Sequence, residues 1–289
     1  MLGLSRLHLD TTMPTYVHGY EARESERLED QARILEALLH EGTVYPPGSR
    51  VLEAGCGTGA QTVALARRSP RAQFTAVDLD AVSLARARAL LQAAGIASVQ
   101  LQRADLRALP FPAASFDHVF ICFVLEHLRE PAAALRALGH LLRPGGTLTV
   151  IEGDHGSVLM HPESAAAHDA VFGLVELQRR AGGDACIGRR LQPLLAESGL
   201  REVRVQPRVA YADGSRPDWA EGFTRRTFAA MVEGVREPVL AAGLSTPERF
   251  DEGLRALLRA AEPDGTFCYT FFKATAVAAF VDSPSQGHS

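Results

Sequence analysis

Apolar residues between positions 45 and 155 follow two alternating patterns. Short apolar runs, typical of buried strands, predict strands at about 50–54, 73–78, 98–103, 117–123 and 147–152. Helical spacing between these runs predicts helices at 59–68, 81–94 and from Pro131 to just before Pro144. Strands that alternate with helices favour a doubly wound α/β fold, in which helices cover both faces of a parallel sheet.

The two ends of the chain depart from this pattern. A one-sided apolar stripe predicts a helix at 21–40. After residue 155 we expect a loop with a helix at about 163–181, a helix at 188–198, and strands at about 201–210 and 267–276. The stretch 211–265 between these strands looks mostly helical and is much longer than an ordinary connection. We interpret it, with 155–183 and the N-terminal helix, as a lid.

A glycine-rich turn follows the first predicted strand, in the sequence VLEAGCGTG at 51–59. Gly55, Gly57 and Gly59 can adopt positive φ and leave the main chain bare, so a ligand can approach it closely. Asp78 ends the second predicted strand, where doubly wound sheets place an acid that holds ribose hydroxyls. The pair predicts a ligand with a nucleoside half.

The details of the turn narrow the choice of ligand. Its spacing is GxGxG rather than the GxGxxG of dinucleotide-binding domains, and no Walker lysine follows. Glu53, two residues before the first glycine, would repel a pyrophosphate but suits a ligand that carries a cation. A nicotinamide enzyme remains the main alternative.

The turn resembles motif I, E/DxGxGxG, of the class I S-adenosylmethionine (SAM) methyltransferases. Further segments agree with that family in order and spacing: Asp78, Ala104-Asp105-Leu106, 116–128 and Leu142-Arg143-Pro144-Gly145-Gly146-Thr147-Leu148. The resemblance implies a Rossmann-like, seven-stranded, mostly parallel sheet, in which the last two strands form a reversed edge and the last strand is antiparallel. It also implies SAM as cofactor and S-adenosylhomocysteine as product.

The family's cofactor contacts are assigned here only to residues that match the family's motifs. Those implied by the resemblance are Tyr16, Tyr20, Glu53, Gly55, Cys56, Gly57, Thr58, Asp78, Leu79, Ala104, Asp105, Leu106, Cys122 and Phe123. Asp78 would take both ribose hydroxyls, Leu79 would pack on adenine, and Asp105 would accept from the adenine amine. The alternatives are helix or turn capping for Glu53 and Asp105, and a hydrophobic staple for the tyrosines.

Candidate catalytic residues follow strands four and five. His155 and Asp154 lie between glycines at the carboxyl end of a predicted parallel strand, and His127 follows strand four. A neutral histidine could accept a proton near pH 7. The alternative is a polar turn in which Asp154 caps the next helix. Cys122 lacks the proline-cysteine context of a methyl-accepting nucleophile.

We expect the following organisation: an N-terminal helical lid segment at 1–45, a core at 46–154, 184–210 and 266–281, a helical cap at 155–183 and 211–265, and a disordered tail at 282–289. The chain starts with Met1, but Met13 is an alternative start because organised sequence begins just after it.

Composition limits the kinds of molecule that the chain is expected to bind. The 289 residues carry a formal net charge of −4 and no dense basic stretch, so a nucleic-acid substrate is not suggested. No long apolar run predicts a membrane span or a signal peptide. Four scattered cysteines without CxxC spacing predict no metal site and a reducing cytoplasm.

The resulting hypothesis is a cytoplasmic methyltransferase that acts on a small organic molecule at O, N or C. A methyltransferase acting on RNA, DNA or protein, and a non-catalytic SAM-binding module, are the alternatives. The acceptor atom and the oligomeric state stay open, although helical caps in this family often meet across a homodimer.

Overall fold

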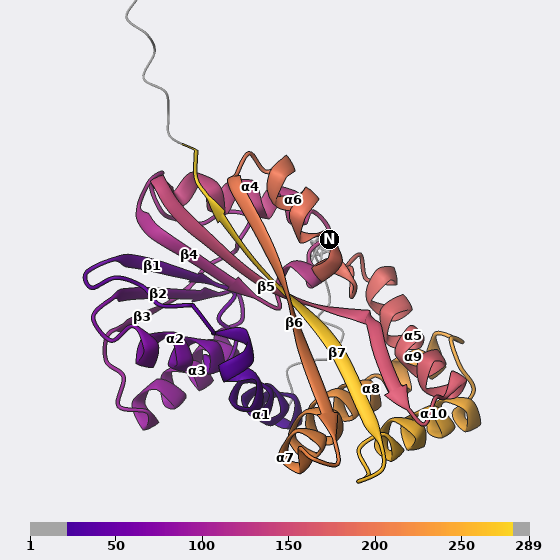
Figure 1. Ribbon diagram of the computed structural model, residues 1–289. Helices are drawn as coiled ribbons and strands as arrows, with labels where there is room; N and C mark the ends of the chain where they lie inside the picture. The colour runs from indigo at the N-terminus through magenta and orange to yellow at the C-terminus, as the bar shows by residue number, and fades with distance from the viewer. Residues whose placement is uncertain (1–21, 280–289) are drawn as a thin grey trace, which may run out of the picture.

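The computed structural model describes residues 22–279, which form a seven-stranded sheet in the order β3-β2-β1-β4-β5-β7-β6 (Figure 1). The strands are β1 Arg50–Ala54, β2 Gln73–Asp78, β3 Val99–Arg103, β4 Phe116–Cys122, β5 Leu142–His161, β6 Arg201–Asp213 and β7 Thr266–Val277. β1 to β5 are parallel, and β7 is antiparallel to both β5 and β6. The expected fold class is confirmed. As expected, the last strand β7 is antiparallel, and β6 beside it runs in the direction of the parallel strands.

Helices connect these strands and cover the sheet. The α-helices are α1 Ala22–Leu39, α2 Ala60–Arg68, α3 Ala81–Ala93, α4 Pro131–Leu141, α5 Ala165–Arg180, α6 Leu191–Glu197, α7 Pro217–Trp219, α8 Ala230–Gly234, α9 Arg236–Ala241 and α10 Pro247–Arg259. Two 3₁₀ helices, η1 Leu125–His127 and η2 Ile187–Arg190, and one π-helix, η3 Ala220–Ala229, complete the set. Asp80 caps α3, because its carboxylate accepts from the Ser83 amide at 2.6 Å.

Alternating residues of the strands build a core on each face of the sheet. Val51 of β1 packs in the cluster that contains Leu39 of α1 and Leu65 of α2. Its neighbour Leu52 packs in a second cluster with Leu135 of α4 and with α6. Side chains that alternate between two buried faces are what a sheet with helices on both sides requires.

β5 is much longer than the sequence pattern predicts. It runs on to His161, where a loop was expected from residue 155, and this second half pairs with β7 from Leu159↔Cys268 to His161↔Thr266. Gly153 and Gly156 look like turn residues in the sequence, but contacts within the fold require them. A Cβ on Gly153 would lie 2.3 Å from the Tyr269 hydroxyl, and one on Gly156 would lie 2.6 Å from Arg189 Nη2. They mark close approach rather than a chain reversal.

The far halves of β5, β6 and β7 carry a second group of helices, drawn at the lower right of Figure 1, which we call the cap: α5, α7, η3, α8, α9 and α10. Phe223, Phe228, Phe250 and Phe267 are each at most 2% exposed within it. They belong to the same apolar cluster as Leu39 of α1, so the cap and one face of the sheet share one core. Within residues 22–279, no helix is both long and apolar enough to cross a bilayer.

The contact between α5 and α10 generates a stability prediction. A Cβ on Gly253 of α10 would lie 2.2 Å from the Ala166 carbonyl oxygen, so Gly253→Ala must push the two helices apart. We expect Gly253→Ala to lower the free energy of unfolding by about 2 kcal/mol, as overpacking usually does. Urea denaturation followed by circular dichroism measures this.

Gly234→Ala is the matched control, because a Cβ there would meet no atom within 4 Å. A methyl group in that helix should be neutral or stabilising by at most about 1 kcal/mol. Equal urea midpoints for the two variants would contradict the proposed close contact.

Candidate active site

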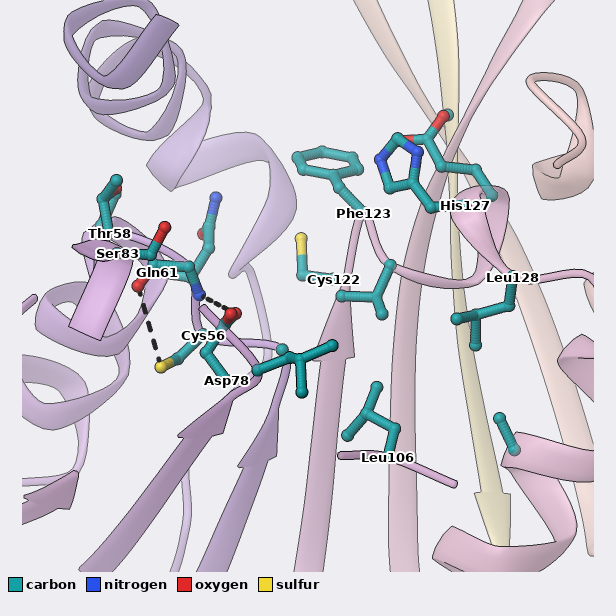
Figure 2. A pocket seen from close by; sticks show the side chains of 18 of the residues that line it. Cys56, Thr58, Gln61, Asp78, Ser83, Leu106, Cys122, Phe123, His127 and Leu128 are labelled. Carbon is teal, nitrogen blue, oxygen red and sulfur yellow. Dashed lines mark hydrogen bonds and ion pairs between the residues drawn. The ribbon is translucent and has the colours of Figure 1, made fainter. Parts of the chain in front are cut away.

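A cavity of about 740 Å³ lies where the carboxyl ends of the parallel strands meet the cap. One end, the cofactor end, is lined by Gly55, Cys56, Gly57, Thr58, Gln61, Asp78, Leu79, Ser83, Ala104, Asp105, Leu106 and Arg107. The other end, the acceptor end, is lined by Phe123, Glu126, His127, Gly153, His155, Phe223, Thr227, Phe228, Met231, Tyr269 and Phe271. Cys122 lies between them. In Figure 2, Asp78 lies on one side of this space and Cys122 and Phe123 lie on the other, and His127 lies beyond Phe123.

The glycine turn exposes bare main chain to the cavity. Gly55, Gly57 and Gly59 all have positive φ, at 76°, 50° and 81°. A Cβ on Gly55 would lie 2.5 Å from Val124 Cγ2, so a side chain there is excluded. A Cβ on Gly57 would meet nothing within 4 Å, and therefore the main chain at Gly57 borders open space that a ligand can fill.

Asp78 is fixed under this turn by two backbone amides. Its Oδ2 accepts from the Gly57 amide at 2.7 Å, and its Oδ1 accepts from the Asp80 amide at 2.9 Å. Burial raises the pKa of the carboxyl, and these amides oppose the rise. Each oxygen keeps a further lone pair, so both can still accept from a ligand hydroxyl.

Glu53 is a buried carboxyl without a full set of partners. It is 2% exposed, and its Oε2 has no hydrogen-bond partner among residues 22–279. Burial raises its pKa to about 8. Glu53 does not line the cavity itself. An orphaned acid just before the turn, together with the open space at Gly57, fits a ligand that brings a cationic amino group.

The remaining residues of the cofactor end suit a flat apolar ring beside a hydrogen-bonding edge. Leu79 is 37% exposed although it is apolar, and it faces the cavity with Ala104 and Leu106. Asp105 also lines the cavity, but Arg107 holds its carboxylate, with Nη2 2.7 Å from Oδ2. Hydrogen bonds from Arg107 lower the pKa of Asp105. Any adenine amine would share this carboxylate with Arg107.

The turn after β4 holds Phe123 in an uncommon conformation. Phe123 has a φ of 57°, and its ring lies 5.6 Å from that of Phe271. Glu152 of β5 fixes this turn, because its Oε1 accepts from the amides of Val124 at 3.0 Å and Leu125 at 2.8 Å. Burial keeps the pKa of Glu152 well above its usual range, and the nearby Glu126 adds to this. Phe123 is thereby fixed between the two ends of the cavity.

Cys122, the last residue of β4, is buried. Burial raises the pKa of its thiol well above the usual range, which makes it a poor nucleophile. Within the described part of the chain the four cysteines are free, and no group of three or more His, Cys, Asp or Glu residues could hold a metal ion.

The acceptor end contains His155 but not Asp154. His155 is 7% exposed, lines the cavity, and has its Nδ1 2.6 Å from the Tyr269 hydroxyl. Asp154 does not line the cavity. Both of its carboxylate oxygens accept hydrogen bonds from Arg189 at 2.7 Å. The expectation that Asp154 contributes to catalysis therefore finds no support in its position, and its ion pair gives it a structural role.

His127 lines the cavity, with its Nε2 3.6 Å from Glu126 Oε1. Of the expected cofactor residues, all those from Gly55 to Phe123 line the cavity, whereas Glu53 lies behind its wall. Tyr16 and Tyr20 lie outside the described residues.

Several lining residues were not foreseen from the sequence. Tyr269 is the clearest, and a signal for it existed: in Phe267-Cys268-Tyr269-Thr270-Phe271, alternate aromatic residues share one face of a strand. All three are buried, and Tyr269 and Phe271 reach the cavity. Gln61 is a second example; its Oε1 accepts from Nε2 of His40 at 2.6 Å, which links the residue that follows α1 to the cofactor end.

Comparisons with known proteins agree with this geometry. Residues 51–146 match the family model described as a methyltransferase domain. The chain is 29% identical over 227 residues to the 27-O-demethylrifamycin SV methyltransferase of Amycolatopsis mediterranei (strain S699), a match that covers 77% of this chain and 76% of that protein.

Two further similarities extend beyond the matched domain. The chain is 28% identical over 216 residues to an uncharacterized 37.1 kDa protein of a Streptomyces fradiae transposon, and this match covers 74% of the chain but only 61% of the relative. Among solved structures, the [4+2]-cyclase SpnF superposes with a TM-score of 0.54 at 20% identity, over 92% of this chain and 85% of that one. This likeness establishes the shared fold.

The buried Glu53 generates a prediction about pH. Its pKa is raised from 4.5 to about 8, so the folded chain holds this proton more tightly than the unfolded chain does. The stabilisation is complete below the unfolded pKa and is lost as the pH rises toward 8. We expect Glu53→Gln to match the parent chain at pH 5 and to exceed its unfolding free energy by on the order of 3 kcal/mol at pH 7.

Urea denaturation without cofactor, at unit steps from pH 5 to pH 8, measures the difference. Glu176→Gln is the control: arginine hydrogen bonds lower the pKa of that exposed carboxyl to about 2, so its effect should stay constant across this window. A pH-independent difference for Glu53→Gln would show that the carboxyl ionises normally.

Proposed function

We propose that the chain is a class I SAM-dependent methyltransferase and that it methylates a small organic molecule held at the acceptor end of the cavity. One observation carries the proposal: a single cavity of about 740 Å³ joins the glycine turn and Asp78 to a wall of aromatic rings. This volume lies within the usual range for small-molecule sites and leaves room for a second molecule beside a nucleoside ligand.

A small acceptor fits the residues that line the acceptor end. The acceptor end is bounded by Phe223, Phe228 and Met231 of the cap, by Tyr269 and Phe271 of β7, and by Arg27 and Gln31 of α1. A wall of aromatic and apolar side chains suits a compact organic molecule. The name of the Amycolatopsis mediterranei relative, a 27-O-demethylrifamycin SV methyltransferase, also supports an organic small molecule as acceptor.

The residues of the cofactor end have assignable roles. We assign ribose binding to Asp78, because both of its oxygens have a lone pair to spare, and adenine packing to Leu79 and Leu106. Glu53 would balance the cationic amino group of the methionine part. When bound, SAM supplies a methyl group on a positively charged sulfur.

The chain contributes mainly alignment and a dry environment. Phe123, fixed by the turn after β4, lines the cavity between the two ends, and an aromatic ring there would stabilise the positive charge of a bound cofactor. Methyl transfer removes that charge, so excluding water with aromatic side chains favours it.

Loss of the ribose contact should weaken cofactor binding. Asp78→Ala removes the acceptors of two hydrogen bonds to a charged group, so we expect the Kd for S-adenosylhomocysteine to rise about 100-fold. Isothermal titration calorimetry measures it. Asp117→Ala is the control, because Asp117 binds Arg50 and Arg143 at the start of β4, away from the cavity. Equal affinities for the Asp78 variant and the parent chain would refute this assignment of the cofactor end.

Filling the acceptor end should stop turnover without removing the cofactor. We expect Met231→Trp to keep its affinity for S-adenosylhomocysteine within about threefold and to lose at least about tenfold in methyl transfer, since the indole occupies acceptor space. Transfer of labelled methyl groups to the low-molecular-weight fraction of a cell extract provides the assay. Phe172→Trp, at a side chain 61% exposed on α5, is the control. Label found in the protein or RNA fraction instead would overturn the small-molecule proposal.

A further inference from the structure

One carboxylate interrupts the aromatic wall of the acceptor end. Glu126 of η1 is 8% exposed, yet it lines the cavity together with Phe223 and Phe228. A carboxylate that is removed from bulk water loses solvation, and this costs free energy unless a cation or several hydrogen-bond donors replace the water. The partners of Glu126 therefore decide what this end of the cavity can bind.

The protein supplies Glu126 with few partners. Its Oε2 accepts from Gln178 Nε2 over a long distance of 3.4 Å, and the same amide also donates to the Glu126 carbonyl oxygen at 2.9 Å. Its Oε1 lies 3.6 Å from His127 Nε2, which is beyond hydrogen-bonding distance. Within residues 22–279, no lysine or arginine forms an ion pair with Glu126. A ligand in the cavity can supply the missing donors.

Two other buried carboxyls near this end have the partners that Glu126 lacks. Asp154 accepts two hydrogen bonds of 2.7 Å from Arg189. Glu152 accepts from two backbone amides at 3.0 and 2.8 Å. Neither of these carboxyls lines the cavity, whereas Glu126 does. The carboxylate with the poorest set of protein partners is thus the one that a ligand can reach.

The negative charge of Glu126 acts across the acceptor end. Burial lowers the pKa of His155, and Glu126 opposes this. Burial raises the pKa of Glu152 and of Tyr269, and Glu126 adds to both rises. The aromatic rings that line the same space have faces that attract cations. Both features favour a positively charged group on the ligand.

One arginine lines the same end, but it is engaged elsewhere. Arg27 of α1 is 8% exposed, and its Nη1 donates to Gln31 at 2.7 Å, which is not its only interaction. An anionic ligand would therefore have to compete with the existing partners of Arg27. A cationic ligand would meet a carboxylate that has no such partner, so the geometry favours the cation.

We propose that the acceptor molecule carries a basic amino group, and that its ammonium binds the carboxylate of Glu126 within the aromatic wall. The inference rests on the proposed function and names the class of its substrate. An ammonium has up to three N–H donors, so it can bind both oxygens of Glu126 while ring faces surround its carbon substituents. Glu126 is then a residue that determines which acceptors bind.

The test compares three probes of similar shape: phenethylamine, phenethyl alcohol and the anion hydrocinnamate. Each is titrated by calorimetry into the full-length chain saturated with S-adenosylhomocysteine, at about pH 8, where an ordinary histidine is uncharged and the amine is still protonated. Phenethylamine should bind at least about tenfold more tightly than the alcohol, and hydrocinnamate should bind most weakly. Equal affinities for amine and alcohol, a preference for the anion, or no binding of the amine at millimolar concentration would overturn the proposal.

Glu126→Gln then assigns the contact, because it removes the charge and keeps the size of the side chain. We expect phenethylamine to lose at least about tenfold in affinity, and phenethyl alcohol and S-adenosylhomocysteine to stay within about threefold. Glu130→Gln is the matched control: Glu130 also lines the cavity, but it is exposed, so solvent screens its charge and the loss should stay below about twofold. An equal loss in the two variants would contradict a specific contact. The probe comparison on the parent chain needs no variant.

The charge of the methylated product is a second measurement. The labelled low-molecular-weight product formed in cell extract should be retained by a cation exchanger at about pH 7, because amines stay protonated there. Labelled product that is neutral or anionic would overturn the inference. If S-adenosylhomocysteine fails to bind, the proposed function itself is wrong. If it binds and the preference for the amine is missing, only the inference about the acceptor falls.

Discussion

The antiparallel pairing of β5 with β7 is the interaction on which both ends of the cavity depend. It extends from Thr147↔Val277 inside the sheet to His161↔Thr266 at the far side of the cap. β5 pairs with β4 through its first half, so the same strand belongs to the cofactor-binding sheet and to the wall of the acceptor end. This is why His155 and Tyr269, 114 residues apart, reach hydrogen-bonding distance.

The glycine turn at the cofactor end is also in direct contact with the turn after β4. Val124, which follows Phe123, packs so closely on Gly55 that no Cβ fits there, and Glu152 holds the Val124 amide. The glycine turn, the turn after β4 and the end of the first half of β5 therefore form one packed unit. Its rigidity explains how Phe123 keeps a left-handed φ of 57° that an isolated phenylalanine would avoid.

The sequence was most informative where local pattern decides the structure. β1 and β2 were predicted with their observed bounds, because each is a short apolar run that ends at a turn signal. Residues 155–161 were wrongly expected to form a loop, because the glycines that Tyr269 and Arg189 require look like turn residues. The pairing of Asp154 with Arg189 and the place of Tyr269 depend on contacts across the fold, which spacing along the chain does not encode. No single-residue signal distinguishes an acid that faces a ligand from one that faces an arginine.

The continuity of β5, β6 and β7 has a consequence for how such proteins diversify. In many enzymes a substrate-selecting module is joined by two flexible linkers and can be exchanged between relatives as a block. Here a junction that exchanged the far halves of β5, β6 and β7 would fall inside hydrogen-bonded strands, for example between Thr149 and Gly153 on β5, and would have to preserve register on three strands at once. New acceptor preferences are therefore more accessible through point changes at the ring-lined wall than through transplantation of the helices above it.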